Sequence, residues 1–294
     1  MPIALQYVLN GIITGSIYAL VAAGFALIYS TNKFMHFAHG AVVVLAGYFF
    51  YSLFSSAHLS IFLALPLTLV FGSLVGLAVY KLAYQPMQKK RASNVVLLIL
   101  SIALLILIEN AIQAIYGADV QQLSVGSARS SLEFAGARIT LLQLAIIASS
   151  VVFFIFLWLG MNKTSLGRKM RAVADSRELA DIAGIDSRKV IAWSFVVGSF
   201  LAAFAGTLIG MEQNLTPTMG TNLMVKAFAG AVVGGVASVP GAIAGSYLVG
   251  LAENLGIVFL PSSYKDAIAF ALLFIFLLAK PEGLFGIEKG VKDV

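Results

Sequence analysis

Hydrophobic and polar residues follow one another along this chain in long blocks. A membrane-spanning helix needs about 20 predominantly apolar residues, and most of the apolar blocks approach or reach that length. They cover residues 3–29, 41–53, 61–80, 94–116, 139–160, 190–211 and 267–280. The pattern predicts an all-α polytopic membrane protein, with residues 1–294 forming one transmembrane domain. The polar segment 117–138 between two of the blocks is long enough for a small structured cap.

A further apolar block, Asn222–Gly256, is too long for one comfortable span and is rich in glycine. The stretch SVPG at Ser238–Gly241 interrupts it, as Gly and Pro commonly do. We expect either two spans here or one broken helix. Two crossings fit the charge distribution better, which gives about 8–9 transmembrane segments. The glycines would let helices pack closely and let one unwind where a solute passes.

The polar block Met161–Val190 is a charged island that holds 11 of the 32 charged residues. Within it, Leu166, Met170 and Val173 are spaced as one apolar stripe of a helix. Arg171 is among the basic residues on the other faces. The pattern therefore predicts a short helix that lies against the membrane domain.

A second short helix is expected directly afterwards. Asp175 would cap its start, with Glu178 three residues later in the spacing of a capping box. Gly184 would end it, since glycine is the common residue after a helix C-terminus. The alternative is a solvated loop whose charges only set the topology.

Composition supports the membrane assignment. Hydrophobic residues make up 60% of the chain and charged residues 11%, with a mean hydropathy of +0.96 and no cysteine. The net charge of +6 does not indicate nucleic-acid binding, because 15 of the 19 basic residues fall on one side of the predicted topology. The positive-inside rule places that side in the cytoplasm. The N-terminus is then outside, the C-terminal tail 281–294 is inside, and no cleaved signal peptide is expected.

Ionisable residues inside spans are costly and mark either a pathway or a structural pair. Glu109 and Asn110 form one such pair, and Glu253 and Asn254 form another; both fall in the predicted outer half. They either line a translocation path or bond helices together. We expect Lys226 to extend outward to water; the alternatives are contact with a substrate carboxylate or with Glu253.

His36 and His39 are three residues apart, a spacing that places two side chains on one helical face. No third ligand is nearby, so we expect helix capping or packing rather than a metal site. No span carries residues with catalytic spacing, and the chain has no G-x-x-x-x-G-K-[ST] phosphate loop. No cofactor is therefore expected in this chain, and an enzyme is not indicated.

Four stretches resemble a known family. ELADIAG, Glu178–Gly184, resembles the E-A-A-x-x-x-G coupling motif of bacterial ABC importer permeases, with Leu179 departing from it. Three others resemble segments of the permeases of branched-chain amino-acid importers (the LivH type), in family order. They are the end of FALIYSTNKFMHFAHG (Phe25–Gly40), KAFAGAVVGGVASVPGA (Lys226–Ala242) and PEGLFG (Pro281–Gly286). The matching positions include Phe37, Ala38, His39, Gly40, Gly234, Gly235, Pro240 and Gly241; His36 replaces the usual Asn.

The resemblance implies a type II importer fold and a complex. In that complex two related permeases form the pore, two cytoplasmic ATPase subunits bind ATP and magnesium, and a periplasmic binding protein delivers a branched-chain or other small neutral amino acid. The ATPase would contact the island through Arg171, Asp175, Glu178, Ala180 and Gly184. Urea or short amides are a related substrate class. A stand-alone secondary transporter or channel, with Glu109, Lys226 and Glu253 as its coupling charges, is the alternative.

Overall fold

Helices dominate the computed structural model, which describes residues 2–123, 130–134 and 136–286. The long helices are α1 (Pro2–Asn32), α2 (His39–Tyr51), α3 (Ile61–Val79), α5 (Asn94–Tyr116), α6 (Leu141–Lys163), α9 (Ser187–Glu212), α10 (Met219–Gly234), α11 (Val239–Gly256) and α12 (Lys265–Ala279). Shorter elements are η1 (Ser52–Ser56), η2 (Tyr80–Tyr84), α4 (Gln85–Lys89), α7 (Ser165–Asp175), α8 (Arg177–Ile182) and η4 (Ser262–Tyr264). The all-α polytopic architecture is confirmed.

The predicted bounds of the second and third spans differ from those of the helices. The third span does not end at Tyr80: η2 and α4 continue it as one helix to Lys89, so much of the predicted basic loop is helical. The π-helical turns of η2 keep the backbone bonded, which is why the helix does not stop where the apolar block stops. The second span likewise begins at His39 and runs through η1 to Ser56.

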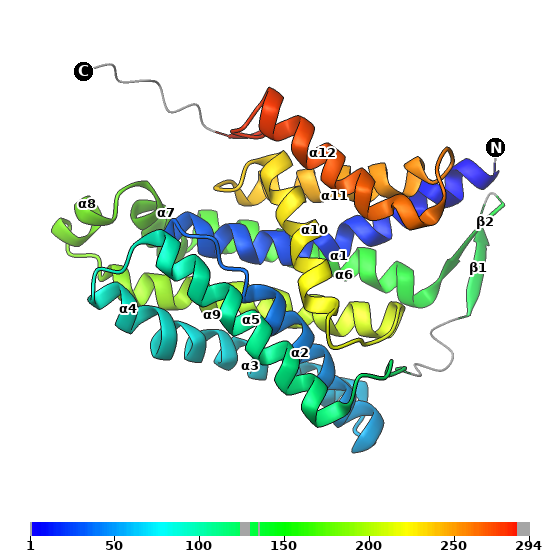
Figure 1. The fold of residues 1–294 in the computed structure, drawn as a ribbon, viewed down its shortest axis with the longest axis horizontal. Coiled ribbons are helices and arrows are strands. Elements are labelled where there is room, and N and C mark those ends of the chain that lie inside the picture. Colours follow the sequence, from blue (N-terminus) through cyan, green and yellow to red (C-terminus); the bar gives the residue numbers. More distant parts are fainter. Residues whose placement is uncertain (1, 124–129, 135, 287–294) are drawn as a thin grey trace.

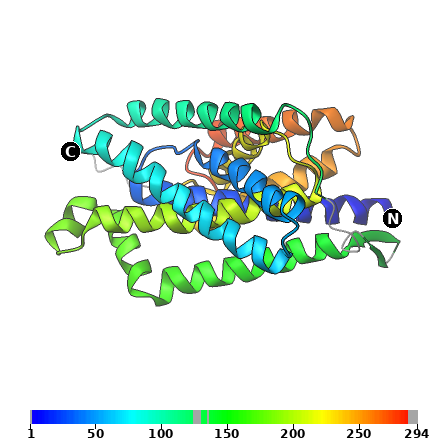
Figure 2. The same ribbon diagram turned by 90° about the horizontal axis from the view of Figure 1, so that it is seen from below.

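The helices α1 and α9 form the centre of the domain. Both are largely buried, whereas α6 and α12 are largely at the surface. Figure 2 shows α5 and α6 on opposite sides of the α1–α9 pair. Large apolar side chains on the outer helices are exposed, including Phe62, Phe156 and Leu278. A membrane protein presents such faces to lipid rather than to water.

The glycine-rich block folds into α10 and α11, whose axes are bent by 116° at a short break. Ser238 caps α11 by accepting a hydrogen bond from Gly241 N (3.2 Å). The prediction of a broken glycine-rich segment is confirmed. Besides this pair, the described residues contain seven helices long and apolar enough to cross a membrane. That each arm of the pair crosses separately stays a prediction.

Two different kinds of structure lie at the two ends of the helical bundle (Figure 1). At one end, near the N-terminus, β1 (Ser131–Phe134) and β2 (Ala137–Thr140) form an antiparallel hairpin. This hairpin confirms a structured cap within 117–138, of which 124–129 and 135 lie outside the described residues. At the other end lie α7 and α8, and α12 runs toward that end (Figure 1). Residues 287–294 of the predicted tail also lie outside the described residues.

Candidate functional site

The charged island folds as two short helices, as its pattern predicts. Thr164 caps α7 by accepting a hydrogen bond from Gly167 N (3.1 Å). The stripe is confirmed: Met170 and Val173 are each 2% exposed and Leu166 is half-buried. Arg171 Nη1 donates a hydrogen bond to the carbonyl oxygen of Met161, which holds α7 against the end of α6. The island is therefore built into the domain rather than suspended from it.

The predicted cap of the second helix is wrong by one residue. Asp175 is the last residue of α7, and Ser176 caps α8 by accepting a hydrogen bond from Leu179 N (3.3 Å). Glu178 consequently falls one position too early for a capping box. The predicted stop at Gly184 is confirmed, because its φ is +81° and Ile185 N donates to Ala180 O (2.9 Å).

The outward face of α8 exposes two large apolar side chains among charged ones. Ala180 is 4% exposed and faces the domain, whereas Leu179 is 66% exposed and Ile182 is 82% exposed. Glu178 is exposed beside them. Exposed apolar side chains rimmed by charge mark an interaction surface. Leu179 and Ile182 were not predicted as contact residues, although two apolar residues at i and i+3 within a charged island are a visible signal.

A carboxylate ties α8 to α9. Asp181 Oδ1 accepts hydrogen bonds from Ser187 N (3.2 Å) and Ser187 Oγ (2.6 Å). These two hydrogen bonds favour the ionised form and lower the pKa of the Asp181 carboxyl. Displacement of α8 would therefore be passed directly to the first turn of α9, the central helix.

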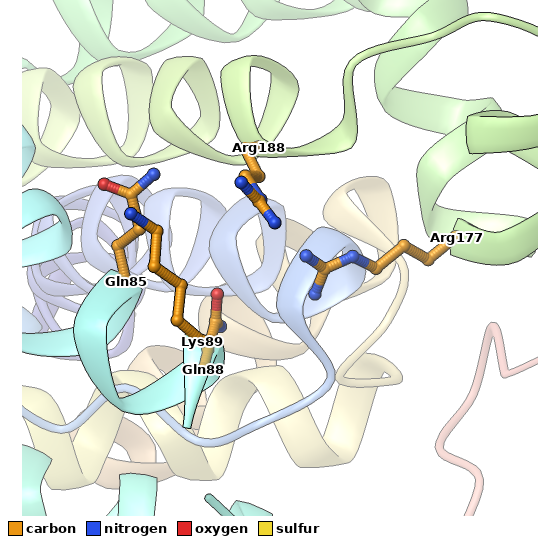
Figure 3. Close-up of a pocket in the computed structure, with 5 residues that line it drawn as sticks. All are labelled: Gln85, Gln88, Lys89, Arg177 and Arg188. Atoms are coloured by element: carbon orange, nitrogen blue, oxygen red, sulfur yellow. The ribbon is translucent and has the colours of Figure 1, made fainter. Parts of the chain in front are cut away.

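A basic pocket lies where α4, α8 and α9 meet. Figure 3 shows its five lining side chains: Gln85, Gln88, Lys89, Arg177 and Arg188. The Arg177 and Arg188 side chains reach toward one another from different elements (Figure 3). The cavity volume of this pocket is about 40 Å³. No acidic residue is among those that line it.

An ion network that is buried at Glu253 and exposed at Asp266 joins four helices. Lys226 Nζ in α10 lies 3.4 Å from Glu253 Oε1 in α11 and 2.7 Å from Asp266 Oδ1 in α12. Tyr18 Oη in α1 donates a hydrogen bond to Glu253 Oε2 (2.9 Å). Of the three possibilities for Lys226, the structure therefore shows the pairing with Glu253 rather than the expected extension to water.

Asn254, the neighbour of Glu253 in sequence, makes a separate contact between α11 and α12. It is 2% exposed, and its Oδ1 accepts a hydrogen bond from Lys265 Nζ (3.1 Å). Asp266 was not among the predicted site residues. The only signal for it was a charged pair, Lys265 and Asp266, at the start of an apolar block.

Glu109 and Asn110 point in different directions and do not form one site. Glu109 is 8% exposed, and its Oε1 accepts hydrogen bonds from Thr221 N (2.8 Å) and Thr221 Oγ1 (2.9 Å). It thus bonds α5 to α10. Asn110 is exposed and donates to Ile106 O within its own helix (2.7 Å). Neither contact requires a solute.

The histidines pack rather than cap. The helix α2 begins at His39, so His36 precedes it and the two do not share a helical face, contrary to the expectation. Their rings are 5.9 Å apart and fully buried, and His36 Nδ1 lies 2.9 Å from Tyr84 Oη. Beside them, Ala38 N donates to Ser101 Oγ (2.8 Å). Phe37 packs on Phe228 of α10 at a ring-centroid distance of 5.4 Å.

Glycine contacts hold the break between α10 and α11. A Cβ on Gly234 would overlap the carbonyl oxygen of Gly241, so the two backbones touch. Gly235 has a φ of +114°, a conformation that residues with a side chain rarely adopt, and Pro240 lies in the first turn of α11. Gly40 makes a similar backbone contact with Gly220.

The stretch Pro281–Gly286 closes this corner. Leu284 N donates to Val233 O and Phe285 N donates to Gly234 O, both at 2.9 Å. Two of the stretches singled out by sequence are thus neighbours in space.

Comparison with known proteins agrees with this arrangement. The model of the family described as "Branched-chain amino acid transport system / permease component" matches residues 7–277. The chain is 32% identical to the high-affinity branched-chain amino acid transport system permease protein BraD of Pseudomonas aeruginosa, over 96% of this chain and 95% of that protein. It is 31% identical to the corresponding permease protein LivH of Escherichia coli K12, with the same coverage.

A more distant relative and a solved structure extend the comparison. The chain is 30% identical to a probable branched-chain amino acid transport permease protein LivH of Methanocaldococcus jannaschii, over 96% of this chain and 93% of that protein. A solved structure of PsaBC from Streptococcus pneumoniae in complex with a Fab resembles the fold with a TM-score of 0.52 at 14% identity. That likeness covers 94% of this chain and 92% of the other. The chain therefore belongs to the family of branched-chain amino acid transport system permease components.

Proposed function

We propose that this chain is the membrane permease of an ATP-driven importer for branched-chain or other small neutral amino acids in the inner membrane. Two ATPase subunits, a second related permease and a periplasmic substrate-binding protein complete the importer. ATP hydrolysis takes place on the ATPase subunits, which hold the nucleotide and magnesium. The stand-alone carrier is set aside because members of this family are components of transport systems.

The observation that carries the proposal is the outward face of α8. A short helix fixed at both ends exposes Leu179 and Ile182 beside Glu178. We assign this face to a groove on the ATPase. Burial of two aliphatic side chains supplies about 1.5–3 kcal/mol each, and Glu178 would add orientation through a cationic partner.

Movement of the ATPase subunits would be transmitted to the membrane domain through the contacts of α7 and α8. Closure of the ATPase pair displaces α8, and the Asp181–Ser187 bonds pass this displacement to α9. The Arg171–Met161 bond passes it to α6. Because α9 lies at the centre of the domain, its tilt would turn the pore from inward-facing to outward-facing.

Orientation follows from the same assignment. The α7–α8 end is cytoplasmic, so the N-terminus and the β1–β2 hairpin are periplasmic. The distribution of basic residues supports this orientation. So does the course of α12, which returns toward the α7–α8 end (Figure 1).

The test is purification of the tagged chain from its own membranes, followed by uptake measurements in liposomes. We expect it to copurify with an ATPase and a second permease, and to take up leucine with the binding protein and ATP. Preference for urea or short amides would correct the substrate class. Uptake by the chain alone without ATP would contradict the proposal.

A substitution separates coupling from folding. Glu178→Arg should leave the chain in the membrane but uncouple uptake from ATP hydrolysis, because it inverts the charge on the docking face. Glu133→Arg, in the hairpin at the opposite end, is the matched control and should retain the ATPase. Normal uptake by Glu178→Arg would remove the coupling assignment.

A further inference from the structure

The basic pocket gathers positive charge from three separate elements. Lys89 comes from α4, Arg177 from α8 and Arg188 from the first turn of α9. Figure 3 shows the two guanidinium groups reaching toward one another, with the Lys89 and Gln85 side chains on the α4 side. Like charges that converge repel one another, unless an anion lies between them.

The nearby carboxylates supply that anion only in part: after the Ser187 hydrogen bonds, the Arg177 charge also lowers the pKa of the Asp181 carboxyl, but the two side chains form no ion pair. Asp186 is paired with Lys189 (3.2 Å), and Asp181 accepts both of its hydrogen bonds from Ser187. In the part of the chain that the structure describes, the side chains of Lys89, Arg177 and Arg188 make no ion pair or hydrogen bond. The pocket is therefore lined by three cationic side chains and by no carboxylate.

The donor set selects the chemistry of the ligand. Two planar guanidinium groups and an ammonium group line this one pocket and together offer many N–H donors. A tetrahedral oxyanion has enough oxygens to accept from all three, and Arg is the preferred residue for such groups. Gln88 is already oriented, since its Nε2 donates to Asn32 Oδ1 (3.2 Å). We propose that this pocket binds a phosphate-class oxyanion.

Two sources can provide that oxyanion. The pocket lies at the end of the long helical span Ile61–Lys89, which also carries the 80% exposed Leu82. A basic pocket at the cytoplasmic end of membrane helices is suited to the headgroup of an anionic phospholipid. The pocket is also within reach of soluble phosphate from the cytoplasm.

Binding would have a mechanical consequence. The oxyanion would connect α4, at the end of one span, to α8 and to α9. It would thereby stiffen the connection between the proposed docking helix and the membrane domain. This inference is independent of the transported substrate, because it requires only an anion at the α7–α8 end.

The experiment measures thermal unfolding of the full chain in nanodiscs. The first arm uses phosphatidylcholine with added inorganic phosphate, and the second uses phosphatidylglycerol without phosphate. We expect a higher unfolding temperature than in phosphatidylcholine alone in at least one arm. A gain in the first arm identifies soluble phosphate as a sufficient ligand, and a gain confined to the second identifies the lipid headgroup. Lipid retained by the chain in native mass spectrometry provides an independent readout.

Variants test the location. Arg188→Gln should weaken binding about tenfold, as expected for loss of one charge-assisted hydrogen bond, and Arg188→Lys should restore part of it. The matched control is Lys81→Gln, which removes an exposed charge from the same span outside the pocket. The proposal fails if neither arm raises the unfolding temperature, or if Arg188→Gln and Lys81→Gln respond alike. It also fails if Arg188→Gln affects only ATPase copurification, which would assign the pocket to a protein carboxylate.

Discussion

The Lys226 ammonium lies 3.4 Å from the Glu253 carboxylate, a group that is 1% exposed, and this pair joins α10 to α11. Lys226→Met removes the cation and leaves a buried anion without its partner. We expect a loss of about 3 kcal/mol in stability, measured as a lower unfolding temperature in detergent. Lys280→Met, at the exposed end of α12, is the control and should be neutral.

Glu253→Gln addresses function at the same place. The amide keeps an acceptor for the Tyr18 hydroxyl but no longer attracts Lys226. Uptake kinetics should change only if this carboxylate lines the translocation path. Unchanged kinetics in liposomes would assign the network to helix packing.

Glu109 and its neighbour Asn110 form a matched pair for mutation. Glu109→Ala removes the acceptor of Thr221 N and Oγ1 and should cost about 1–3 kcal/mol. Asn110→Ala removes only a bond within its own helix and should change stability little. Thermal unfolding of both variants checks the prediction, and equal losses would contradict the difference in burial.

Gly234→Ala should destabilise the chain by about 3 kcal/mol, because the new methyl group would overlap the Gly241 carbonyl oxygen. Gly160→Ala is the control, since a Cβ there meets nothing within 4 Å. We expect it to be neutral or stabilising by about 0.5–1 kcal/mol. The yield and the unfolding temperature of the two variants show whether the loss comes from the close backbone contact at Gly234 or from replacing any glycine of the chain.

Ile182→Asp should abolish ATPase copurification without loss of stability, because the side chain is 82% exposed. Ala180→Asp, two residues earlier, should instead destabilise α8, since Ala180 is 4% exposed. Retention of the ATPase by Ile182→Asp would show that the outward face of α8 is not the docking surface.

The sequence predicted what depends on neighbouring residues. The stripe of Met170 and Val173, the stop at Gly184 and the break near Ser238 follow from local spacing, and the structure confirms each. Contacts between segments that are distant in sequence could not be predicted from local spacing. Nothing in the spacing of Asp266 indicates that it meets Lys226, because that ion pair depends on how α10 and α12 are packed.

Local rules also failed where two residues compete for one role. Asp175 and Ser176 are both good capping residues, and the structure uses Ser176 because α7 continues through Asp175. Similarly, Tyr80 ends an apolar block but does not end a helix, because η2 and α4 carry the helix to Lys89. The end of hydrophobicity and the end of a helix are separate properties.

The pairing of Leu284 and Phe285 with the last carbonyls of α10 has a consequence for biosynthesis. A chain made from its N-terminus inserts α10 and α11 before these two residues leave the ribosome. Until then Val233 O and Gly234 O lack the partners that a helix C-terminus needs. The corner between α10 and α11 is therefore completed only after α12 has been synthesised, and a nascent chain stopped before Leu284 would present an unfinished corner to membrane quality control.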